Sequence, residues 1–381
     1  MKIAQFATAA MSVRILLLDH IKALEADGHE VTAICADGPM VKDLRDMGVK
    51  VETVKISREL TPVSDARTLA EVTRLLRKHR FDVVHTHTPK AGLIGPVAAR
   101  LAGVKHIVHT IHGLLFHAQM TRSRRAVFWI PEKWTALFST HLLSQSREDI
   151  DVAVETGLCP KEKIEYLGNG IDPDKFDPSK SNGAALRREL QIPENAFVVG
   201  CVGRLVLEKG FGDLFDAAER VGRDPDLQDV CFVVIGPEEP DQNDAIDRRV
   251  LEKLKASGQV RFLGWRDDVH ELYSIMNVFV LPSWREGIPR ACMEASAMEL
   301  PIIATNVRGI REVVLDGVSG RLVPLRDVDA LTTAIREFYF ARNEIAEMGR
   351  AGRRHVIANH SQKMVLSRLS DFYHRLPQAR Q

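Results

Sequence analysis

The strongest chemical signal is a pair of glutamates, Glu286 and Glu294, that follows an apolar run in the second half of the chain. The run at 278–281 is typical of a buried strand, and Glu-Gly-Ile-Pro then opens an expected helix. Glycine lets the backbone approach a ligand, proline suits a first helical turn, and N–H groups at a helix start favour a diphosphate. A helix across the whole segment would separate the glutamates by roughly 12 Å, from a rise of ~1.5 Å per residue. That span is comparable to the distance from a sugar across two phosphates to a ribose, which favours ligand contacts over two exposed helix charges.

A second segment carries two cations after another apolar run. The expected strand at 197–202 is followed by Gly203 and Arg204, and Lys209 with its following glycine opens the next expected helix. Two cations at the carboxyl end of a strand can clamp a diphosphate leaving group, and stabilising the charge that develops there is usually the largest catalytic contribution. Alone, these residues fit a solvated surface turn equally well. The Glu-Gly-Ile-Pro segment favours the clamp.

Short apolar runs alternate with longer amphipathic stretches along the whole chain. Such alternation predicts parallel sheets covered by helices on both faces. The expected strands are 2–6, 30–35, 50–54, 82–85, 106–110 and 141–144 in the first half, and 197–202, 231–235, 260–262, 278–281, 302–304 and 321–323 in the second.

The length of 381 residues fits two domains, and a loop-rich stretch at 168–190 is the best linker candidate. We therefore expect an α/β fold of two Rossmann-like, doubly wound parallel-sheet domains that face each other across a cleft. The expected domains are 1–180 and 181–360, with a helix at 361–381 that packs back on the N-terminal domain. Parallel sheets bind ligands outside the carboxyl ends of their strands, so the site is expected in the cleft.

These segments resemble the donor site of the family 4 retaining glycosyltransferases of GT-B fold. The resemblance covers nearly the whole chain, is most specific over 196–325, and is looser in the first half, where this family binds acceptors. The matching motifs are Gly203-Arg204 with Glu208-Lys209-Gly210, Glu286-Gly-Ile-Pro with Glu294, Asn169-Gly-Ile-Asp172, and Asn306-Val-Arg-Gly-Ile-Arg-Glu-Val-Val314 with Asp316-Gly-Val-Ser-Gly320.

The resemblance also implies a role for each matched residue. Arg204 and Lys209 would bind the donor diphosphate, Glu286 would contact the donor sugar, and Glu294 would hold the ribose hydroxyls. The backbone of Gly287 and Ile288 would meet the phosphates. Gly203 and Pro289 complete the donor-binding set, together with Leu263, which lies in the Phe-Leu-Gly-Trp segment expected to line the base pocket.

His112 is the candidate from the first half. It precedes a glycine at the end of the expected strand 106–110, and the resemblance implies that its imidazole meets the donor sugar from the opposite domain. The alternative is a histidine in a surface turn, since histidines are frequent nearby; these are His85, His87, His106, His109 and His117. One departure from the family is the segment 8–14, where a Gly-Gly loop is replaced by non-glycine residues, with Arg14 as the substitute contact.

The resulting hypothesis is a retaining transfer of a hexosyl or N-acetylhexosaminyl group from a nucleoside diphosphate sugar to an acceptor hydroxyl. The resemblance favours UDP, with GDP open, and an acceptor in surface polysaccharide or lipid-linked glycan assembly. Two alternatives share the architecture: a nucleotide-sugar epimerase and a non-catalytic subunit that only binds nucleotide sugar. No cofactor and no catalytic metal are expected, because Asp149-Ile-Asp151 lies in a helical pattern and Asp172-Pro-Asp174 lies in the expected linker.

Composition argues against some functions and indicates one candidate contact surface. The net charge of +1 does not favour nucleic-acid binding, and five scattered cysteines suggest reduced thiols in the cytoplasm. No signal peptide or spanning helix is expected. The stretch 116–138 mixes arginines with aromatic residues, which suits contact with an inner-membrane surface, and equally a helix that packs its aromatics in the core.

Overall fold

The computed structural model describes residues 1–57, 59, 61–117, 120–240 and 242–377. They form two compact units: unit 1 is Met1–Gly168 with the described part of Lys363–Gln381, and unit 2 is Asn169–Gln362. Residues 169–180, expected with the N-terminal domain, lie in unit 2 because Ile171 and Phe176 are buried in its core. Residues 378–381 of the expected C-terminal helix fall outside the described part.

Unit 1 is built on a seven-stranded parallel sheet in the order β3-β2-β1-β4-β5-β6-β7. Its strands are β1 (Lys2–Phe6), β2 (Glu30–Cys35), β3 (Lys50–Thr53), β4 (Val83–Thr86), β5 (His106–Ile111), β6 (His141–Ser144) and β7 (Ile164–Tyr166). Its helices are α1 (Ala10–Ser12), the π-helical turn η1 (Val13–Leu17), α2 (Leu18–Ala26), α3 (Met40–Asp46), α4 (Pro62–His79), α5 (Pro89–Ala102), α6 (Arg122–Phe138), α7 (Arg147–Glu155), the short η2 (Lys161–Lys163) and α16 (Gln362–Arg375).

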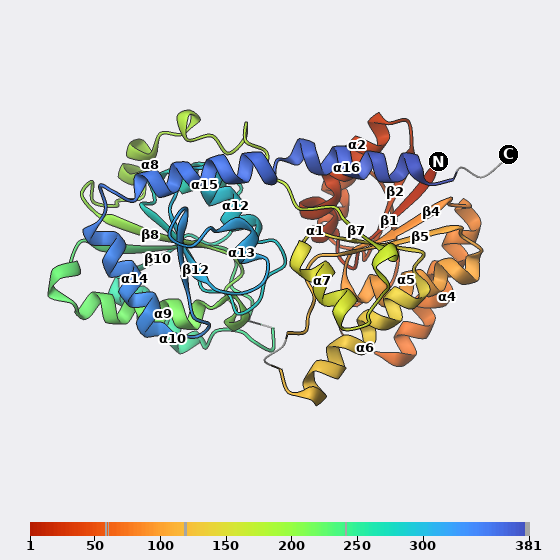
Figure 1. The fold of residues 1–381 in the computed structure, drawn as a ribbon, viewed down its shortest axis with the longest axis horizontal. Coiled ribbons are helices and arrows are strands. Elements are labelled where there is room, and N and C mark those ends of the chain that lie inside the picture. The colour runs from red at the N-terminus through yellow and green to blue at the C-terminus, as the bar shows by residue number, and fades with distance from the viewer. Residues whose placement is uncertain (58, 60, 118–119, 241, 378–381) are drawn as a thin grey trace. The chain divides into compact units, whose positions relative to one another are not determined.

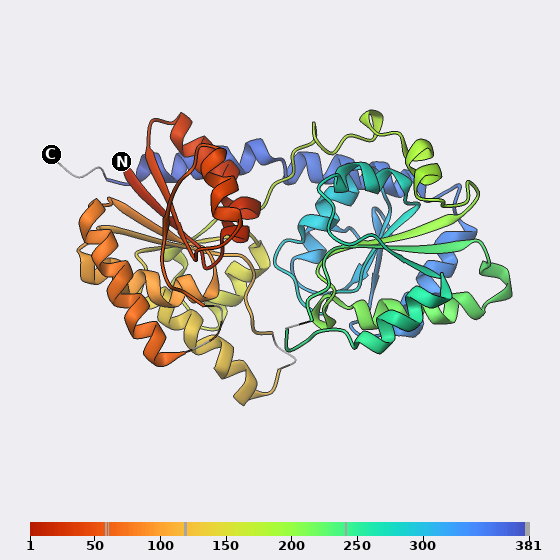
Figure 2. The same cartoon turned by 180° about the vertical axis from the view of Figure 1, so that it is seen from behind.

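Apolar side chains on both faces of this sheet are covered by helices. Alternate strand residues such as Ile3 and Val83 pack against α2, α3 and α16, whereas Ala4 and Val84 pack against α4 and α5. Figure 1 shows α2 and α16 on one side of the strands and α4, α5 and α6 on the other, and Figure 2 shows the same layers from behind. The last helix of the chain therefore belongs to the core of unit 1.

Unit 2 repeats the plan with a six-stranded parallel sheet in the order β10-β9-β8-β11-β12-β13. Its strands are β8 (Phe197–Val202), β9 (Val230–Ile235), β10 (Val260–Phe262), β11 (Val278–Leu281), β12 (Ile302–Thr305) and β13 (Gly320–Val323). Its α-helices are α8 (Gly183–Glu189), α9 (Phe211–Arg223), α10 (Arg248–Ser257), α11 (Val269–Leu272), α12 (Arg290–Ala297), α13 (Ile310–Val313), α14 (Val328–Phe340) and α15 (Ala346–Asn359). Short 3₁₀ turns are η3 (Pro178–Lys180), η4 (Leu207–Lys209), η5 (Pro225–Leu227) and η6 (Tyr273–Ile275).

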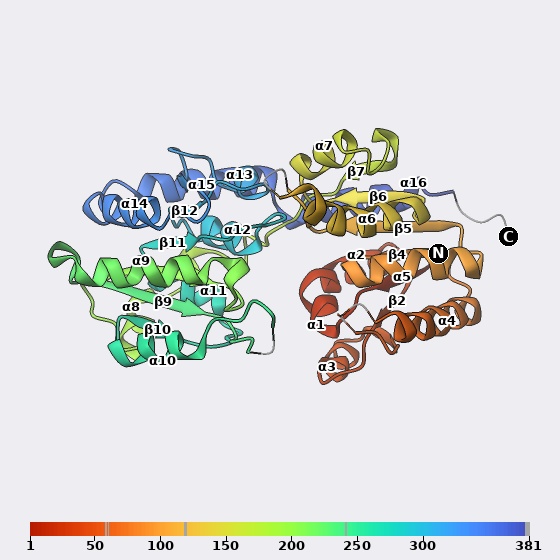
Figure 3. The same cartoon turned by 90° about the horizontal axis from the view of Figure 1, so that it is seen from below.

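The faces of the unit 2 sheet are also divided between two sets of helices. Val198 and Phe279 face α8, α11, α12, α13 and α15, whereas Val199 and Val280 face α9, α10 and α14. In Figure 3 the second set lies nearest the viewer. The expected α/β class with two doubly wound parallel sheets is confirmed.

Two local differences from the sequence expectation bear on function. The segment 8–14 is mostly helical, because α1 begins at Ala10 and η1 follows it directly. The segment after β11 becomes helical only at Arg290. The separation of roughly 12 Å assumed a helix from Glu286 to Glu294 at ~1.5 Å per residue, and that assumption is wrong.

Candidate active site

The sheet order of unit 2 gathers two of the sequence motifs at one edge. β8 lies between β9 and β11, so the connections that leave β8 and β11 run to opposite sides of the sheet. In doubly wound sheets this switch point is where ligands bind, outside the carboxyl ends of the strands. Residues 203–209 follow β8 and residues 282–289 follow β11. The fold thus places both motifs where a ligand site is expected.

An ion pair joins the two motifs directly. The Nζ atom of Lys209 lies 2.7 Å from Oε1 of Glu286, and the Glu286 side chain is only 9% exposed. A carboxylate this far from water needs a partner, and the ammonium supplies both charge and a hydrogen bond. The sequence argument gave these residues separate ligands and did not foresee the pair, because nothing in their spacing reports on contact across the sheet.

Backbone contacts hold the two connections close together. Gly210 has a φ of 73°, and a Cβ atom there would lie 2.0 Å from the carbonyl oxygen of Pro282. The N–H of Trp284 donates to the carbonyl of Glu208 over 2.9 Å, and the Glu208 carboxylate accepts from Arg285. The position of Glu286 beside Lys209 is therefore fixed by the main chain as well as by charge.

Arg204 differs from Lys209 in being exposed. Its guanidinium makes no hydrogen bond or ion pair with any residue that the structure describes. The preceding residue is well anchored, since the N–H of Gly203 donates to the carbonyl of Ile235 over 2.9 Å. A cation at the end of β8 is thus available to an anionic ligand.

Glu294 lies on α12 and is 8% exposed. The hydroxyl of Tyr273 donates to its Oε2 atom over 2.9 Å, and Nε of Arg290 donates to Oε1 over 3.1 Å. Burial raises the pKa of this carboxyl group, and the charge of Arg290 opposes the change. Because a carboxylate accepts about four hydrogen bonds, both oxygens keep capacity for a diol.

The remaining donor-site candidates lie around these side chains. Ile288 is buried in the core, and its carbonyl accepts from Nδ2 of Asn169 over 3.1 Å. Pro289 is the residue before the first turn of α12. Leu263 follows β10, where its N–H donates to the carbonyl of Val234 over 2.9 Å, and its side chain packs on the core.

Gly309 supports the Glu-Gly-Ile-Pro segment from the loop after β12. Its φ is 72°, and a Cβ atom built on it would lie 1.3 Å from the carbonyl oxygen of Gly287. Only glycine fits this contact, because a methyl group at 1.3 Å would force the backbone of Gly287 away. The motif around 306–314 thus acts as a brace for the motif around 286.

His112 belongs to unit 1 and follows β5. Its Nε2 atom lies 3.2 Å from Nδ1 of His87, whereas its Nδ1 atom is closed to solvent and has no hydrogen-bond partner among the described residues. Burial lowers the pKa of His112 to about 4, with a smaller effect from His20; Gln145 opposes the change without completing a hydrogen bond to Nδ1. The ring is therefore neutral at neutral pH, and a buried acceptor without a partner costs roughly 1–3 kcal/mol.

His87, given little weight on sequence grounds, is the histidine that touches His112. Burial lowers its pKa and that of His85, and it lowers the pKa of His109 to about 3. The contact depends on how β4 and β5 are paired, which the sequence does not reveal. His106 lies elsewhere, bound to the carbonyl of Pro377 over 2.9 Å.

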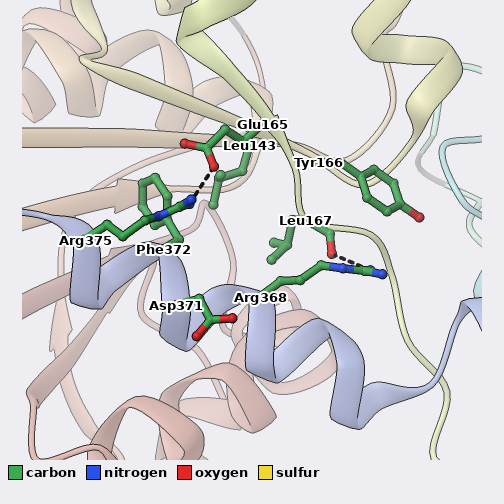
Figure 4. A pocket seen from close by; sticks show the side chains of 8 residues that line it. All are labelled: Leu143, Glu165, Tyr166, Leu167, Arg368, Asp371, Phe372 and Arg375. Carbon is green, nitrogen blue, oxygen red and sulfur yellow. Dashed lines mark hydrogen bonds and ion pairs between the residues drawn. The ribbon is translucent and has the colours of Figure 1, made fainter.

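Two further features of the described residues lie apart from these motifs. No group of three or more His, Cys, Asp or Glu side chains among them is arranged to hold a metal ion. A cavity of about 190 Å³ lies between β7 and α16 (Figure 4). Its arginines are engaged there: Arg375 pairs with Glu165 over 2.6 Å, and Arg368 donates to the carbonyl of Leu167. None of the donor-site candidates lines this cavity.

The segments that contain these motifs match known protein families. Residues 13–175 match the family model described as Glycosyltransferase Family 4, and residues 196–339 match the one described as Glycosyl transferases group 1. A UDP-Gal:alpha-D-GlcNAc-diphosphoundecaprenol alpha-1,3-galactosyltransferase of Escherichia coli is 31% identical over 85% of this chain and 83% of its own. The chain belongs to this glycosyltransferase family.

Two further matches extend over almost the whole glycosyltransferase. The capsular polysaccharide biosynthesis glycosyltransferase CapM of Staphylococcus aureus is 27% identical over 98% of this chain and 96% of its own. The crystal structure of Anabaena Alr3699/HepE in complex with UDP and glucose superposes with a TM-score of 0.82 at 20% identity, covering 99% of this chain and 100% of that one. The GT-B fold, the family and the enzyme class predicted from the sequence are confirmed.

The contact between Gly309 and Gly287 leads to a prediction about stability and donor binding. Gly317 is the matched control, because its φ is also 72° but a Cβ atom there would meet nothing within 4 Å. Gly317→Ala should lower the free energy of unfolding by ~1–2 kcal/mol from backbone strain alone. Gly309→Ala should lower it further and weaken binding of a nucleotide-sugar donor, because Gly287 must move. Chemical denaturation and donor titration measure both effects, and equal losses in the two variants would contradict the role of the brace.

Proposed function

We propose that this glycosyltransferase transfers a hexosyl or N-acetylhexosaminyl group from a UDP-sugar to a hydroxyl of a lipid-linked glycan acceptor, with retention at the anomeric carbon. The names of the E. coli and S. aureus relatives support this donor, this kind of acceptor and a place in surface polysaccharide assembly. The observation that carries the proposal is the Lys209–Glu286 ion pair, with the exposed Arg204 following the neighbouring strand.

The arrangement suggests which group meets each part of the donor. Arg204 and Lys209 bind the diphosphate, while Lys209 stays near Glu286, which accepts hydrogen bonds from the sugar hydroxyls. Glu294 accepts from the ribose diol. The two cations stabilise the charge that develops as the bond between the anomeric carbon and the phosphate oxygen breaks. The proposal therefore assigns that charge to side chains and invokes no metal ion.

Retention is proposed to come from attack on the same face of the sugar. The pairing with Lys209 makes Glu286 a weak nucleophile, so it is not assigned a covalent intermediate. The acceptor oxygen forms the new bond to the anomeric carbon while the departing phosphate oxygen takes the acceptor proton. Atoms and charge balance, since the products are the glycosylated acceptor and a nucleoside diphosphate.

Removal of the exposed cation tests the proposal. Arg204→Ala should lower kcat by about 10²-fold, comparable to the loss of one transition-state hydrogen-bond donor. Arg220→Ala is the control, because Arg220 of α9 is also a partly exposed arginine of unit 2 but pairs with Asp329 of α14. The assay uses a panel of UDP- and GDP-sugars with a lipid-linked acceptor, and NMR of the product reads the anomeric configuration.

The same assay separates the proposal from its alternatives. Incubation with donor alone would interconvert the sugar if the protein were an epimerase, and no turnover with any acceptor would indicate a binding subunit. An inverted anomeric centre, or an Arg204→Ala protein with unchanged kcat, would contradict the mechanism.

A membrane contact is proposed for α6, which lies in the stretch 116–138; residues 118 and 119 of that stretch are outside the described part. Four apolar side chains spaced three and four residues apart lie on one side of the helix and are between 44% and 66% exposed; they are Val127, Ile130, Trp134 and Leu137. The core interpretation holds only for other positions of α6, such as Phe128 and Trp129, which pack partly against buried residues.

The charge of α6 suggests which surface covers the apolar stripe. Arg122 and Arg124 are exposed in its first turn, whereas the ammonium of Lys133 donates to the carbonyls of Gly157 and Leu158. Basic and apolar residues on one helix favour a surface of anionic lipids, where both attractions act together. No described helix of the protein combines the length and the apolar character that a membrane crossing requires.

Vesicle binding tests this contact. Ile130→Asp with Leu137→Asp should abolish co-sedimentation with vesicles containing phosphatidylglycerol, because two charges would enter the lipid boundary. Val63→Asp is the matched control, since Val63 is 72% exposed on α4 of the same unit. Wild-type binding should weaken as salt rises. Equal binding by the double variant and the wild type would contradict the contact.

A further inference from the structure

A buried chain of hydrogen bonds connects the last helix of the protein to His112, entirely within unit 1. The hydroxyl of Tyr373 on α16 lies 3.2 Å from Nε2 of Gln5. The Oε1 atom of Gln5 lies 2.5 Å from Nε2 of His87, and Nδ1 of His87 lies 3.2 Å from Nε2 of His112. Gln5 and Tyr373 are fully buried, and His87 is 2% exposed.

Strand register explains why these residues meet. Gln5 on β1 is paired with His85 on β4, so the two side chains point to the same face of the sheet, the face that α16 covers. His87 follows β4 and His112 follows β5, at the carboxyl edge of the same strands. Gln5 and His85 thus lie on a face of the sheet whose other side chains, such as Ile3 and Val83, are apolar.

The donors and acceptors along the chain have only one consistent direction once the Gln5 amide is placed. Its nitrogen donates to Tyr373, so its oxygen accepts a proton from Nε2 of His87. The Nδ1 atom of a neutral His87 is then bare and accepts from Nε2–H of His112. The proton of His112 therefore sits on Nε2.

A side branch agrees with this direction. Because the Tyr373 hydroxyl accepts from Gln5, its own proton is free to bond Nδ1 of His85, 2.8 Å away. The Nε2–H of His85 then donates to the hydroxyl of Thr110 over 2.7 Å. The direction of each of these bonds follows from the orientation of the Gln5 amide, and a reversed amide would reverse them all.

We infer that Tyr373, acting through Gln5 and His87, holds the proton of His112 on Nε2 and leaves its Nδ1 atom as a hydrogen-bond acceptor. His112 is the candidate catalytic residue of unit 1. Tyr373, Gln5 and His87 are positioning residues. The Nδ1 atom of His112, which has no hydrogen-bond partner among the described residues, is the atom left without a proton.

The surroundings keep the chain uncharged. Burial lowers the pKa of His87, and the rings of His85, His112, His20 and His109 lower it further. These neighbours come from β4, the loop after β5, α2 and β5. No acidic side chain is among the groups that act on the His87 pKa. A neutral His87 is thus the stable form at neutral pH, which the direction of the chain requires.

Nitrogen NMR measures the inferred state without turnover. The free protein is labelled with ¹⁵N-histidine, and the His112 signals are assigned by their loss in His112→Gln. The wild type should show a protonated Nε2 and an unprotonated Nδ1. A proton on Nδ1 of His112 in the wild type would overturn the inference, and would leave the proposed transferase activity untouched. The expected tautomer in a protein without transfer activity would instead count against the proposed function alone.

Gln5→Glu makes a sharper test, because a carboxylate can only accept hydrogen bonds. Its charge should raise the pKa of His87, and a charged His87 donates from Nδ1 to His112. Below that pKa the proton of His112 should move to Nδ1. As the pH rises through it, His112 should return to the wild-type tautomer. A His112 signal that does not change with pH in this variant would contradict the relay.

Tyr373→Phe is a second test of the inference, which stays usable if the Gln5→Glu protein does not fold. It removes one hydroxyl and frees the Gln5 amide to turn, so His112 should show both tautomers. Thr86→Val is the matched control. Thr86 lies on β4, and its hydroxyl oxygen is 2.8 Å from Nδ1 of the buried His109, but it does not belong to the hydrogen-bond chain. It should leave the His112 signals unchanged. A single, wild-type tautomer in Tyr373→Phe would show that α16 does not set it.

Discussion

The Lys209–Glu286 ion pair depends on one geometric constraint, the switch of strand order at β8 and β11. At this point two connections leave the sheet in opposite directions, which is where doubly wound sheets bind ligands. The carboxylate is almost closed to water, so it needs the ammonium even without a donor. The close backbone contacts at Gly210 and Gly309 keep the pair in place. The candidate site residues of unit 2 are therefore held in place mostly by main-chain packing, with charge as the second support.

Much of unit 2 could be predicted because its signals are local. The strands β8, β10 and β11 are apolar runs with sharp ends, and their bounds were predicted correctly. The motifs that follow them are contiguous, so their chemistry is legible in the sequence. In unit 1, β7 was missed because Ile164 is its one buried residue and the charged residues 161–163 precede it, so no apolar run marks the strand. The beginning of unit 2 at Asn169 was also missed, since the burial of Ile171 and Phe176 depends on partners far along the chain.

Unit 1 shows where local reasoning ends. His112 was found because a strand and a glycine flank it, whereas His87, Gln5 and Tyr373 carry no motif. Their contacts depend on the register of β1 against β4 and on the return of α16, and both are long-range properties. The helix α6 is similar: its basic and aromatic content was plain, but only the structure separates the residues that pack inward from those that face outward.

The return of α16 has a consequence for how the protein matures. A chain made from its N-terminus presents all seven strands of unit 1 before the helix that covers one of their faces exists. The apolar side chains around Leu143 and Leu167 are covered by α16 only after the whole of unit 2 has been translated. The same holds for the buried polar chain that ends at Tyr373. Ribosome-bound intermediates would therefore expose the apolar face of an incomplete N-terminal sheet, the kind of surface that chaperones bind.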